Sequence, residues 1–199
     1  ARLIRHSSRL NKGALLDIGT GTGYFSHFMQ QKGWNVSAIE KSPQAREFAR
    51  EHFALDVKAP EELTGLSDTS FDVITLWHVM EHLEHLNETW EILHRILKER
   101  GILIIAVPNP TSYDAQKYRE MWGAYDVPRH LWHFSPSIIQ QFGAKHGFIL
   151  AEQHPMPFDA FYVSILSEKY KKNKMPFLKG MLNGMRAWFA SAANKERSS

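Results

Sequence analysis

Several ionisable side chains lie in one short aromatic stretch of the chain. Side chains of these types can bind an acidic group and transfer a proton. The stretch reads Asp-Val-Pro-Arg-His-Leu-Trp-His-Phe-Ser from Asp126 to Ser135. Histidine is the commonest general base in enzymes, and the permanent charge of Arg129 suits an acidic ligand. We therefore expect His130 or His133 to act as a catalytic base and Arg129 to orient a substrate. The alternative is a surface loop with a structural Asp126–Arg129 pair, because ionisable groups among aromatic rings must be paired or solvated.

A second group of histidines lies in the stretch His-Val-Met-Glu-His from His78 to His82. As a string it matches the inverted zinc-protease motif, which needs a continuous helix so that both histidines face one metal. Here the string directly follows a predicted strand, and a third ligand is not evident. We therefore predict no metal site. We expect a loop on which His78 lines a cofactor, while the histidines and Glu81 make local hydrogen bonds.

The elements that would position these groups begin with a glycine-rich stretch. An apolar run from Ala14 to Ile18 leads into it and an amphipathic stretch follows, which is how a Rossmann-like unit begins. Glycines let a ligand lie directly against the main chain. The dinucleotide fingerprint needs glycine at its sixth position, where this chain has Tyr24. The stretch predicts a cofactor loop of another kind, with an ordinary glycine-rich loop as the alternative; its candidate residues are Asp17, Gly19, Thr20, Gly21, Gly23 and Tyr24.

An acidic residue follows the next predicted strand. Glu40 directly follows the run 35–39 and lies 21 positions after Gly19, close to the distance at which a Rossmann-like unit places an acid on ribose hydroxyls. A carboxylate suits that work because it accepts two hydrogen bonds from a vicinal diol. The alternative is a surface glutamate beside Lys41.

Apolar runs alternate with amphipathic segments along the rest of the chain. The runs predict strands over 14–18, 35–39, 54–57, 71–76, 101–107 and 148–154, and the periodicity predicts helices over 23–32, 43–52, 87–97, 136–146, 158–170 and 176–193. Ser42 and Ser135 each precede a proline, the pattern of a helix N-cap. The alternation indicates an α/β, doubly wound, mostly parallel sheet with right-handed crossovers.

Four segments within residues 14–107 resemble class I S-adenosylmethionine-dependent methyltransferases in order and spacing. They read DIGTGTG, IEKSP, SFDVITLWHVMEHL and LKERGILIIAVPNP, and the later DVPRHLWHFSP is similar to a bacterial subgroup of small-molecule methyltransferases. The resemblance implies a Rossmann-like fold, S-adenosylmethionine as cofactor with S-adenosylhomocysteine as product, and O-methylation of a small-molecule acceptor. Beyond the glycine loop, the cofactor-binding residues that it implies are Glu40, Lys41, Ala59, Pro60, Trp77 and His78.

The chain departs from the family pattern at three places. Family members carry an acid for adenine after the third strand, whereas this chain reads Lys58-Ala59-Pro60, so we expect main-chain contacts there. Ubiquinone-type O-methyltransferases are similar around Glu81 and His82, and some bind a divalent ion there, but they carry an acid at the position of His78. The fold closes with an antiparallel strand in the family, and no apolar run follows Phe189 to form it.

Composition and charge limit the function classes. The 199 residues hold no cysteine, which excludes disulfides, thiolate metal sites and a cysteine nucleophile. Eight basic residues and one acid follow Glu168, which leaves 16 of the 24 basic and 20 of the 21 acidic residues in the preceding part. A mildly acidic body does not indicate nucleic-acid binding. No apolar run is long enough to span a membrane, so we expect a cytoplasmic protein without stable membrane insertion.

Residues 1–157 are expected to form the methyltransferase domain, with the aromatic insertion 108–135 as a substrate lid. Residues 158–199 would be a basic helical appendage of the same domain. Its last helix, 176–193, carries an apolar stripe that we expect to pack on the body or on a second subunit in a homodimer, with a membrane surface as the alternative. A nicotinamide-dependent oxidoreductase and a non-catalytic cofactor-binding module are the competing functions.

Overall fold

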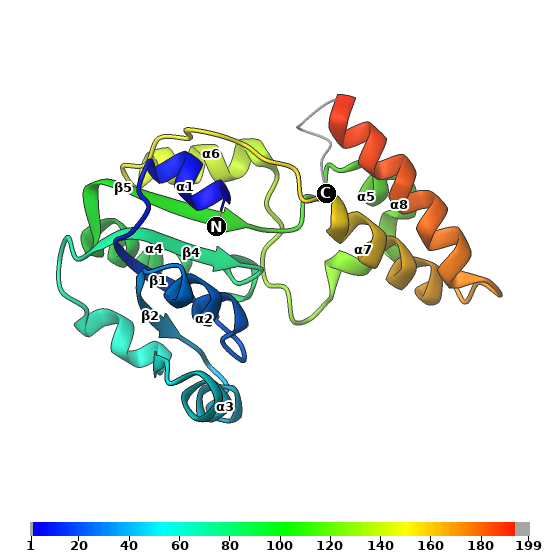
Figure 1. The fold of residues 1–199 in the computed structure, drawn as a ribbon. Coiled ribbons are helices and arrows are strands. Elements are labelled where there is room, and N and C mark those ends of the chain that lie inside the picture. Colours follow the sequence, from blue (N-terminus) through cyan, green and yellow to red (C-terminus); the bar gives the residue numbers. More distant parts are fainter. Residues whose placement is uncertain (1, 194–199) are drawn as a thin grey trace. The chain divides into compact units, whose positions relative to one another are not determined.

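The computed structural model describes residues 2–193. The chain divides into two compact units, with the boundary between Val107 and Pro108 (Figure 1). The first unit holds the candidate cofactor loop, and the second holds the candidate base and Arg129. The expected grouping of residues 1–157 as one methyltransferase domain stays a prediction.

The first unit is built on a five-stranded parallel sheet in the order β3-β2-β1-β4-β5. The strands are β1 (Ala14–Ile18), β2 (Asn35–Ile39), β3 (Asp56–Lys58), β4 (Phe71–Trp77) and β5 (Leu97–Ala106). The chain runs outward from β1 on one side and from β4 on the other, so the strand order reverses between these two neighbours. Ligands of doubly wound folds bind at that point, beyond the carboxyl ends of the strands. The predicted fold class is confirmed.

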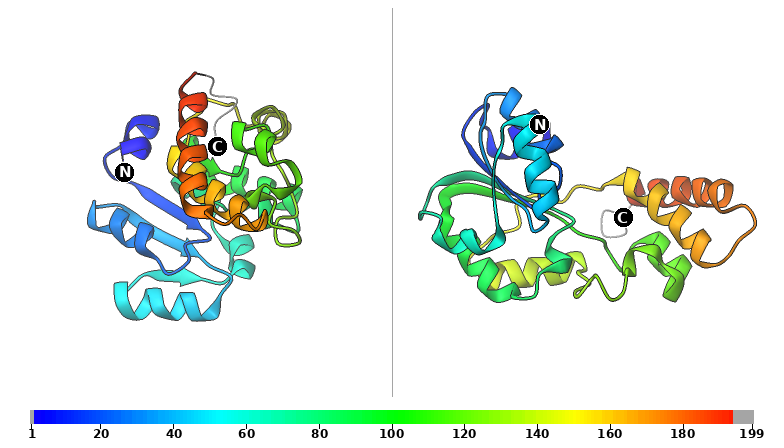
Figure 2. Two further views of the ribbon diagram at one scale, coloured as in Figure 1. Left: turned by 90° about the vertical axis from the view of Figure 1, so that its right-hand side faces the viewer. Right: turned by 90° about the horizontal axis from the view of Figure 1, so that it is seen from below.

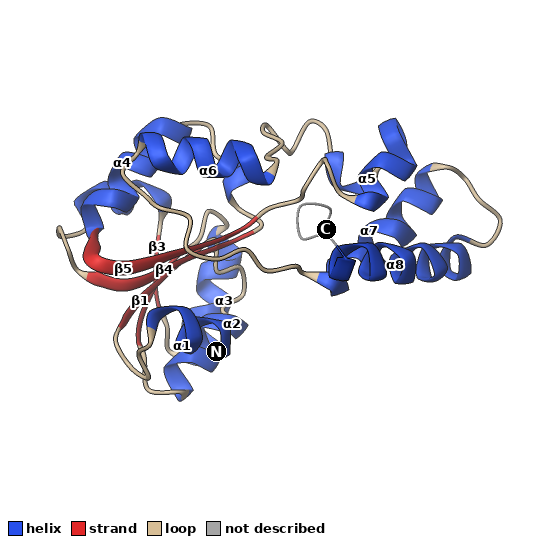
Figure 3. Ribbon diagram, turned by 90° about the horizontal axis from the view of Figure 1, so that it is seen from above, coloured by secondary structure: helices blue, strands red, loops and turns tan. Residues whose placement is uncertain are grey.

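Helices cover both faces of this sheet. Figure 3 shows α1 (Arg2–Ser8), α2 (Tyr24–Gln31) and α3 (Pro43–Phe53) on one side and α4 (Leu86–Ile96) on the other. Short 3₁₀ turns, η1 (Pro60–Gly65) and η2 (Met80–His82), follow β3 and β4. The side chains that join α1 and α2 to the sheet form one buried cluster: Ile4, Leu15, Met29, Trp34, Val36 and Val73. Ser42 caps α3 by accepting a hydrogen bond from the amide of Ala45, as the Ser-Pro pattern predicts.

Asp72 ties three strands together at the amino end of the sheet. Its Oδ2 accepts a hydrogen bond from the Ala14 amide and its Oδ1 accepts one from Lys98 Nζ, both at 2.8 Å. Burial by itself would raise the pKa of Asp72, but these two donors outweigh it and hold the pKa below its usual range. The carboxylate therefore links β1, β4 and β5 at this end of the sheet.

The second unit is helical. It contains α5 (Tyr113–Tyr118), η3 (Arg119–Met121), η4 (Gly123–Tyr125), α6 (Pro136–Lys145), α7 (Pro157–Tyr170) and α8 (Pro176–Ala193). Figures 1 and 2 show α7 and α8 side by side. Ala115, Tyr118, Trp122 and Ala124 form a buried cluster. The indole of Trp122 donates to Asp114 Oδ2 at 2.8 Å, so this buried carboxylate also helps to fix the insertion.

The sixth strand that we predicted over 148–154 is wrong. This segment has no regular secondary structure, and the side chain of Ile149 is 93% exposed. Its apolar residues therefore do not meet a sheet face, and the apolar run alone gave a false strand signal. The fifth strand begins earlier than predicted, because Leu97 pairs with Phe71 across an irregularity in the ladder. None of the helices within residues 2–193 is both long and apolar enough to cross a membrane.

Candidate functional site

The loop between β1 and α2 turns sharply at three glycines. Gly19, Gly21 and Gly23 have φ values of 75°, 57° and 86°, in the left-handed region that side-chain-bearing residues rarely adopt. The amides of Gly19 and Thr20 both donate to the carbonyl of Ile39, at 2.8 and 3.1 Å. The loop is therefore fastened to the carboxyl end of β2.

Each of the three positions requires a glycine, but the reasons differ. A Cβ at Gly19 would lie 2.2 Å from Val79 Cγ2, and one at Gly23 would lie 2.7 Å from Leu55 Cδ1. These two glycines let the chain pack closely upon itself. A Cβ at Gly21 would meet no described atom within 4 Å. The missing side chain at Gly21 therefore leaves open space against the main chain, which is what a ligand needs in order to approach the backbone.

Asp17 holds the base of the loop together. Its carboxylate accepts hydrogen bonds from Thr75 Oγ1 at 2.7 Å and Ser26 Oγ at 2.8 Å, and Thr20 Oγ1 donates to Ser26 at 2.8 Å. Only 1% of Asp17 is exposed, and burial raises the pKa of its carboxyl despite these donors. The acid that ends the first strand therefore links β1, β4 and α2 around the loop.

A cavity of about 380 Å³ opens beside this loop. It lies where β1 and β4 end, and its size falls within the range of small-molecule and cofactor sites. The rings of Phe25 and Trp77 meet edge to face, with centroids 5.6 Å apart. Our sequence reasoning missed Phe25, although its place in the first turn after the glycines is a usable signal. The lining residues are Asp17, Gly19, Thr20, Phe25 and Trp77.

Glu40 lies at the loop, as its spacing from Gly19 predicts. Its Oε2 accepts a hydrogen bond from the Gly21 amide and its Oε1 accepts one from the Ser42 amide, both at 2.8 Å. The guanidinium of Arg46, which sequence reasoning missed, donates to the main-chain oxygens of Glu40 and Lys41 at 2.8 and 2.9 Å. The carboxylate is thus held at the exposed glycine of the loop.

The other candidate cofactor residues of the first unit are less directly placed. The Lys41 ammonium lies 3.7 Å from Glu84 and its side chain is mostly exposed. Tyr24 packs edge to face on Phe53, with ring centroids 5.0 Å apart, and is largely exposed. The Ala59 amide donates to Glu62 Oε1 at 2.9 Å within the turn that begins at Pro60. A main-chain contact between Ala59 and adenine would therefore have to replace this bond.

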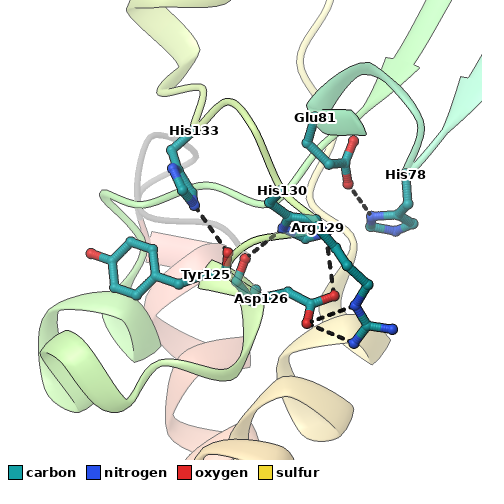
Figure 4. Close-up of polar contacts among 8 residues, drawn as sticks. His78, Glu81, Tyr125, Asp126, Arg129, His130 and His133 are labelled. Carbon is teal, nitrogen blue, oxygen red and sulfur yellow. Dashed lines mark hydrogen bonds and ion pairs between the residues drawn. The ribbon is translucent and has the colours of Figure 1, made fainter. Parts of the chain in front are cut away.

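His78 and Glu81 come together just after β4. The His78 backbone has φ 55°, its amide donates to Ala106 O at 2.9 Å, and its Nδ1 lies 3.6 Å from Glu81 Oε1 (Figure 4). Glu81 is buried, and residues 80–82 form a single 3₁₀ turn. The continuous helix that a zinc-protease motif requires is not formed by these residues.

In the second unit, the structure brings together the ionisable residues of the aromatic stretch. Arg129 Nη2 and Nε donate to Asp126 Oδ1 at 2.7 and 3.2 Å (Figure 4). These hydrogen bonds to the Asp126 carboxylate raise the pKa of the Arg129 guanidinium. His130 Nδ1 lies 2.8 Å from Ala124 O, and His133 Nε2 lies 3.2 Å from Tyr125 O. Both imidazoles are thus oriented by main-chain carbonyls.

The contacts of His130 determine which of its nitrogens can take a proton. A carbonyl oxygen only accepts, so Nδ1 must carry the hydrogen in the bond to Ala124. In the neutral ring, Nε2 is then the basic nitrogen, and it lies 3.9 Å from Asp126 Oδ2. A proton taken by Nε2 would form an imidazolium beside a carboxylate. This geometry suits a general base.

Comparisons with known proteins agree with the fold. Residues 2–153 match the family model described as a methyltransferase domain. A ubiquinone biosynthesis O-methyltransferase of Xanthomonas oryzae pv. oryzae is 33% identical over 148 residues, which are 69% of this chain and 62% of that protein. The mitochondrial ubiquinone biosynthesis O-methyltransferase of Schizosaccharomyces pombe is 32% identical over 105 residues, which are 49% of this chain and 38% of that protein.

A crystal structure of a SAM-dependent methyltransferase from Archaeoglobus fulgidus has a similar fold. Its TM-score is 0.61 at 22% identity, and the match covers 86% of this chain and 84% of that one. The chain spans about half the length of the curated relatives it matches. The matched region contains the glycine loop, Glu40 and the residues from Asp126 to His133.

Proposed function

This chain belongs to the methyltransferase domain family, and from that membership we propose that it transfers the methyl group of S-adenosylmethionine to an oxygen of a small-molecule acceptor. The observation that carries the proposal is the pairing of Gly21, open to a ligand, with the carboxylate of Glu40. Relatives named as O-methyltransferases of ubiquinone biosynthesis and of malonyl-[acyl-carrier protein] support oxygen as the acceptor atom.

The residues of the first unit fit S-adenosylmethionine. Glu40 offers a carboxylate for the ribose diol, since each oxygen accepts one main-chain donor and has a second lone pair for a hydroxyl. Phe25 and Trp77 give the cavity an apolar wall beside the glycine loop. Asp17 keeps the loop in place through Ser26 and Thr75. When bound, the cofactor supplies an electrophilic methyl group, and the protein's task is to align it with the acceptor.

The residues of the second unit fit an acceptor that must lose a proton. A hydroxyl or phenol becomes a better nucleophile as its proton leaves, and His130 offers Nε2 for that proton. Asp126 would stabilise the resulting imidazolium, and Arg129 would hold an acidic group of the acceptor. His133 is the alternative base. His78 would line the donor side of the reaction.

A binding experiment separates this function from its nearest competitor. We expect isothermal titration calorimetry to detect S-adenosylhomocysteine and to give no heat with NAD. Incubation with S-adenosylmethionine carrying a labelled methyl group and with catechol, a generic phenolic acceptor, should then transfer label to the organic product. Binding of NAD without binding of S-adenosylhomocysteine would overturn the proposal. If S-adenosylhomocysteine binds but no label is transferred to any phenol or carboxylic acid, O-methylation is rejected and the cofactor assignment stands.

A further inference from the structure

The last helix meets its neighbour through its smallest residues. Gly180, Asn183, Gly184 and Ala187 lie on one side of α8 and are buried. A Cβ at Gly180 would lie 2.5 Å from the Cα of Ile165 on α7, and one at Gly184 would lie 2.8 Å from the Cα of Phe161. The two helix backbones therefore approach so closely at Gly180 and Gly184 that a side chain at either position would clash with α7.

The large apolar side chains of α8 point to the other side. Phe177 is 67% exposed and Phe189 is 69% exposed, and the members of the whole stripe are Phe177, Leu178, Met181, Leu182, Met185, Trp188 and Phe189. We call these seven residues the α8 stripe. Seven large apolar side chains exposed along one helix form the kind of continuous patch that marks an interaction site. The stripe lies on the side of α8 away from Gly180 and Gly184.

Charge distinguishes between the possible occupants of this surface. The α7–α8 pair carries six exposed cations, Lys169, Lys171, Lys172, Lys174, Lys179 and Arg186. Its two acids are Asp159 and Glu168, and Glu168 is buried among Tyr118, Asn173 and Asn183. Residues 169–193 contain no acid at all. A second copy docked through this surface would bring like charges together, whereas an anionic surface would neutralise them.

The arrangement along α8 is that of a helix lying in an interface. At 100° per residue, Lys179 and Arg186 fall on one flank of the stripe, between it and the buried side. A membrane-surface helix likewise places aromatic and aliphatic residues in the acyl boundary and its basic residues at the headgroups. Phe158 and Tyr162 of α7 are exposed aromatic residues of the same helix pair.

We propose that the α7–α8 pair docks on an anionic lipid surface, with the α8 stripe in the interface and the lysines and Arg186 at the headgroups. This reverses the order of our sequence-based expectations, which favoured packing on the body or on a second subunit. The reason is that α8 meets α7 through Gly180 and Gly184, which leaves the stripe exposed, while the cations around the stripe oppose a second copy. The proposal does not depend on the identity of the methyl acceptor.

Vesicle co-sedimentation of the full chain tests the proposal. We expect most of the protein to pellet with vesicles of equal parts phosphatidylglycerol and phosphatidylcholine, and little to pellet with phosphatidylcholine alone. Raising the salt from about 0.1 M to about 1 M shortens the Debye length from about 10 Å to about 3 Å and should release the protein. Equal pelleting with both vesicle types, or none with either, would overturn the proposal.

Variants assign the binding to this surface. Phe189→Ser should weaken the partition to anionic vesicles about tenfold or more, because it removes an aromatic group from the interface. Lys179→Glu together with Arg186→Glu should weaken it more than tenfold, at about fivefold for each cation removed. The matched control is Phe28→Ser, which removes an exposed aromatic side chain from α2 and should change nothing. All variants should keep their affinity for S-adenosylhomocysteine.

The competing occupant has its own signature. Sedimentation velocity across a range of protein concentrations should show one species whose mass does not change. A dimer that forms with rising concentration and disappears in Phe189→Ser would overturn the proposal in favour of a second copy of the chain.

Discussion

The amide of Gly21 donates a 2.8 Å hydrogen bond to Oε2 of Glu40, which is 19 positions further along the chain. Gly21 ends up there because the loop turns through left-handed φ values, and Glu40 because the β2 strand ends beside it. The bond brings the carboxylate to the glycine whose missing side chain leaves open space. A ligand lying over Gly21 therefore lies within reach of a fixed negative charge.

We predict that Glu40→Ala weakens S-adenosylhomocysteine binding by about 1.5–3 kcal/mol, because a hydrogen bond to a charged group contributes that much. Isothermal titration calorimetry measures the change. The control is Glu84→Ala, which removes the carboxylate that faces Lys41 at 3.7 Å and should leave the affinity unchanged. Affinity equal to wild type in Glu40→Ala would remove Glu40 from the cofactor site.

Alanine at two glycines of the loop should separate ligand binding from folding. Both Gly21 and Gly23 have positive φ, so either alanine costs about 1–2 kcal/mol of stability. At Gly23 the new methyl group would also meet Leu55 and Ala49, which adds about 1–3 kcal/mol from overpacking. Urea unfolding should therefore rank Gly23→Ala as the less stable variant.

The two variants Gly21→Ala and Gly23→Ala should rank differently in their affinity for S-adenosylhomocysteine. The methyl group of Gly21→Ala would project into the space proposed for the cofactor, so calorimetry should show weaker S-adenosylhomocysteine binding in a protein that is still folded. Unchanged affinity in Gly21→Ala would mean that the cofactor does not lie over this glycine.

Sequence reasoning worked best where local rules act alone. The strands 14–18 and 35–39 have the bounds that the apolar runs predict, and the glycine spacing led to a loop with three positive φ values. Ser42 and Ser135 cap their helices because an N-cap depends only on the next three residues. Glu40 could be placed because it directly follows the strand 35–39, so the end of that strand sets its position.

The failures arise where the answer depends on distant residues. The segment 148–154 begins with an apolar run like that of a strand, but it does not pair with the sheet, and strand pairing depends on residues far away in the sequence. Phe25 joins the cavity only because Trp77, which is 52 positions away, meets its ring. The periodicity of α8 also gave no sign that this helix meets α7 through Gly180 and Gly184, on the side away from the stripe. A helical periodicity does not say which face is inside.

The buried network around Tyr118 predicts a loss of stability in alkali. Its hydroxyl donates to Glu168 Oε1 at 3.0 Å and accepts from Asn183 Nδ2 at 2.6 Å. Burial, together with the neighbouring carboxylate, raises the pKa of Tyr118 to about 12. An unfolded tyrosine titrates near pH 10, so between about pH 10 and 12 the unfolded state loses its proton first.

The contribution of Tyr118 to the free energy of unfolding is therefore fully present below about pH 10. It falls by about 2–3 kcal/mol as the pH rises to about 12. We expect urea unfolding to show this extra loss in the wild type relative to Tyr118→Phe. Tyr162→Phe, at an exposed tyrosine of α7, serves as the control and should follow the wild type. The same alkaline slope in Tyr118→Phe would assign the loss to other groups.

The catalytic prediction concerns His130. Its Nδ1 donates to the carbonyl of Ala124, so Nε2 is the nitrogen that can take the acceptor's proton, beside the carboxylate of Asp126. His130→Ala should lower kcat about 10²–10⁴-fold and remove the acidic limb of its pH profile, because the rate then no longer depends on a deprotonated base. The measurement is kcat against pH with any phenolic acceptor that turns over. His133→Ala, made in parallel, tests the alternative base, and His78→Ala should change the binding of the donor more than the pH profile. If both His130→Ala and His133→Ala keep the wild-type kcat and its acidic limb, the proton goes elsewhere and the aromatic stretch serves only to hold the acceptor.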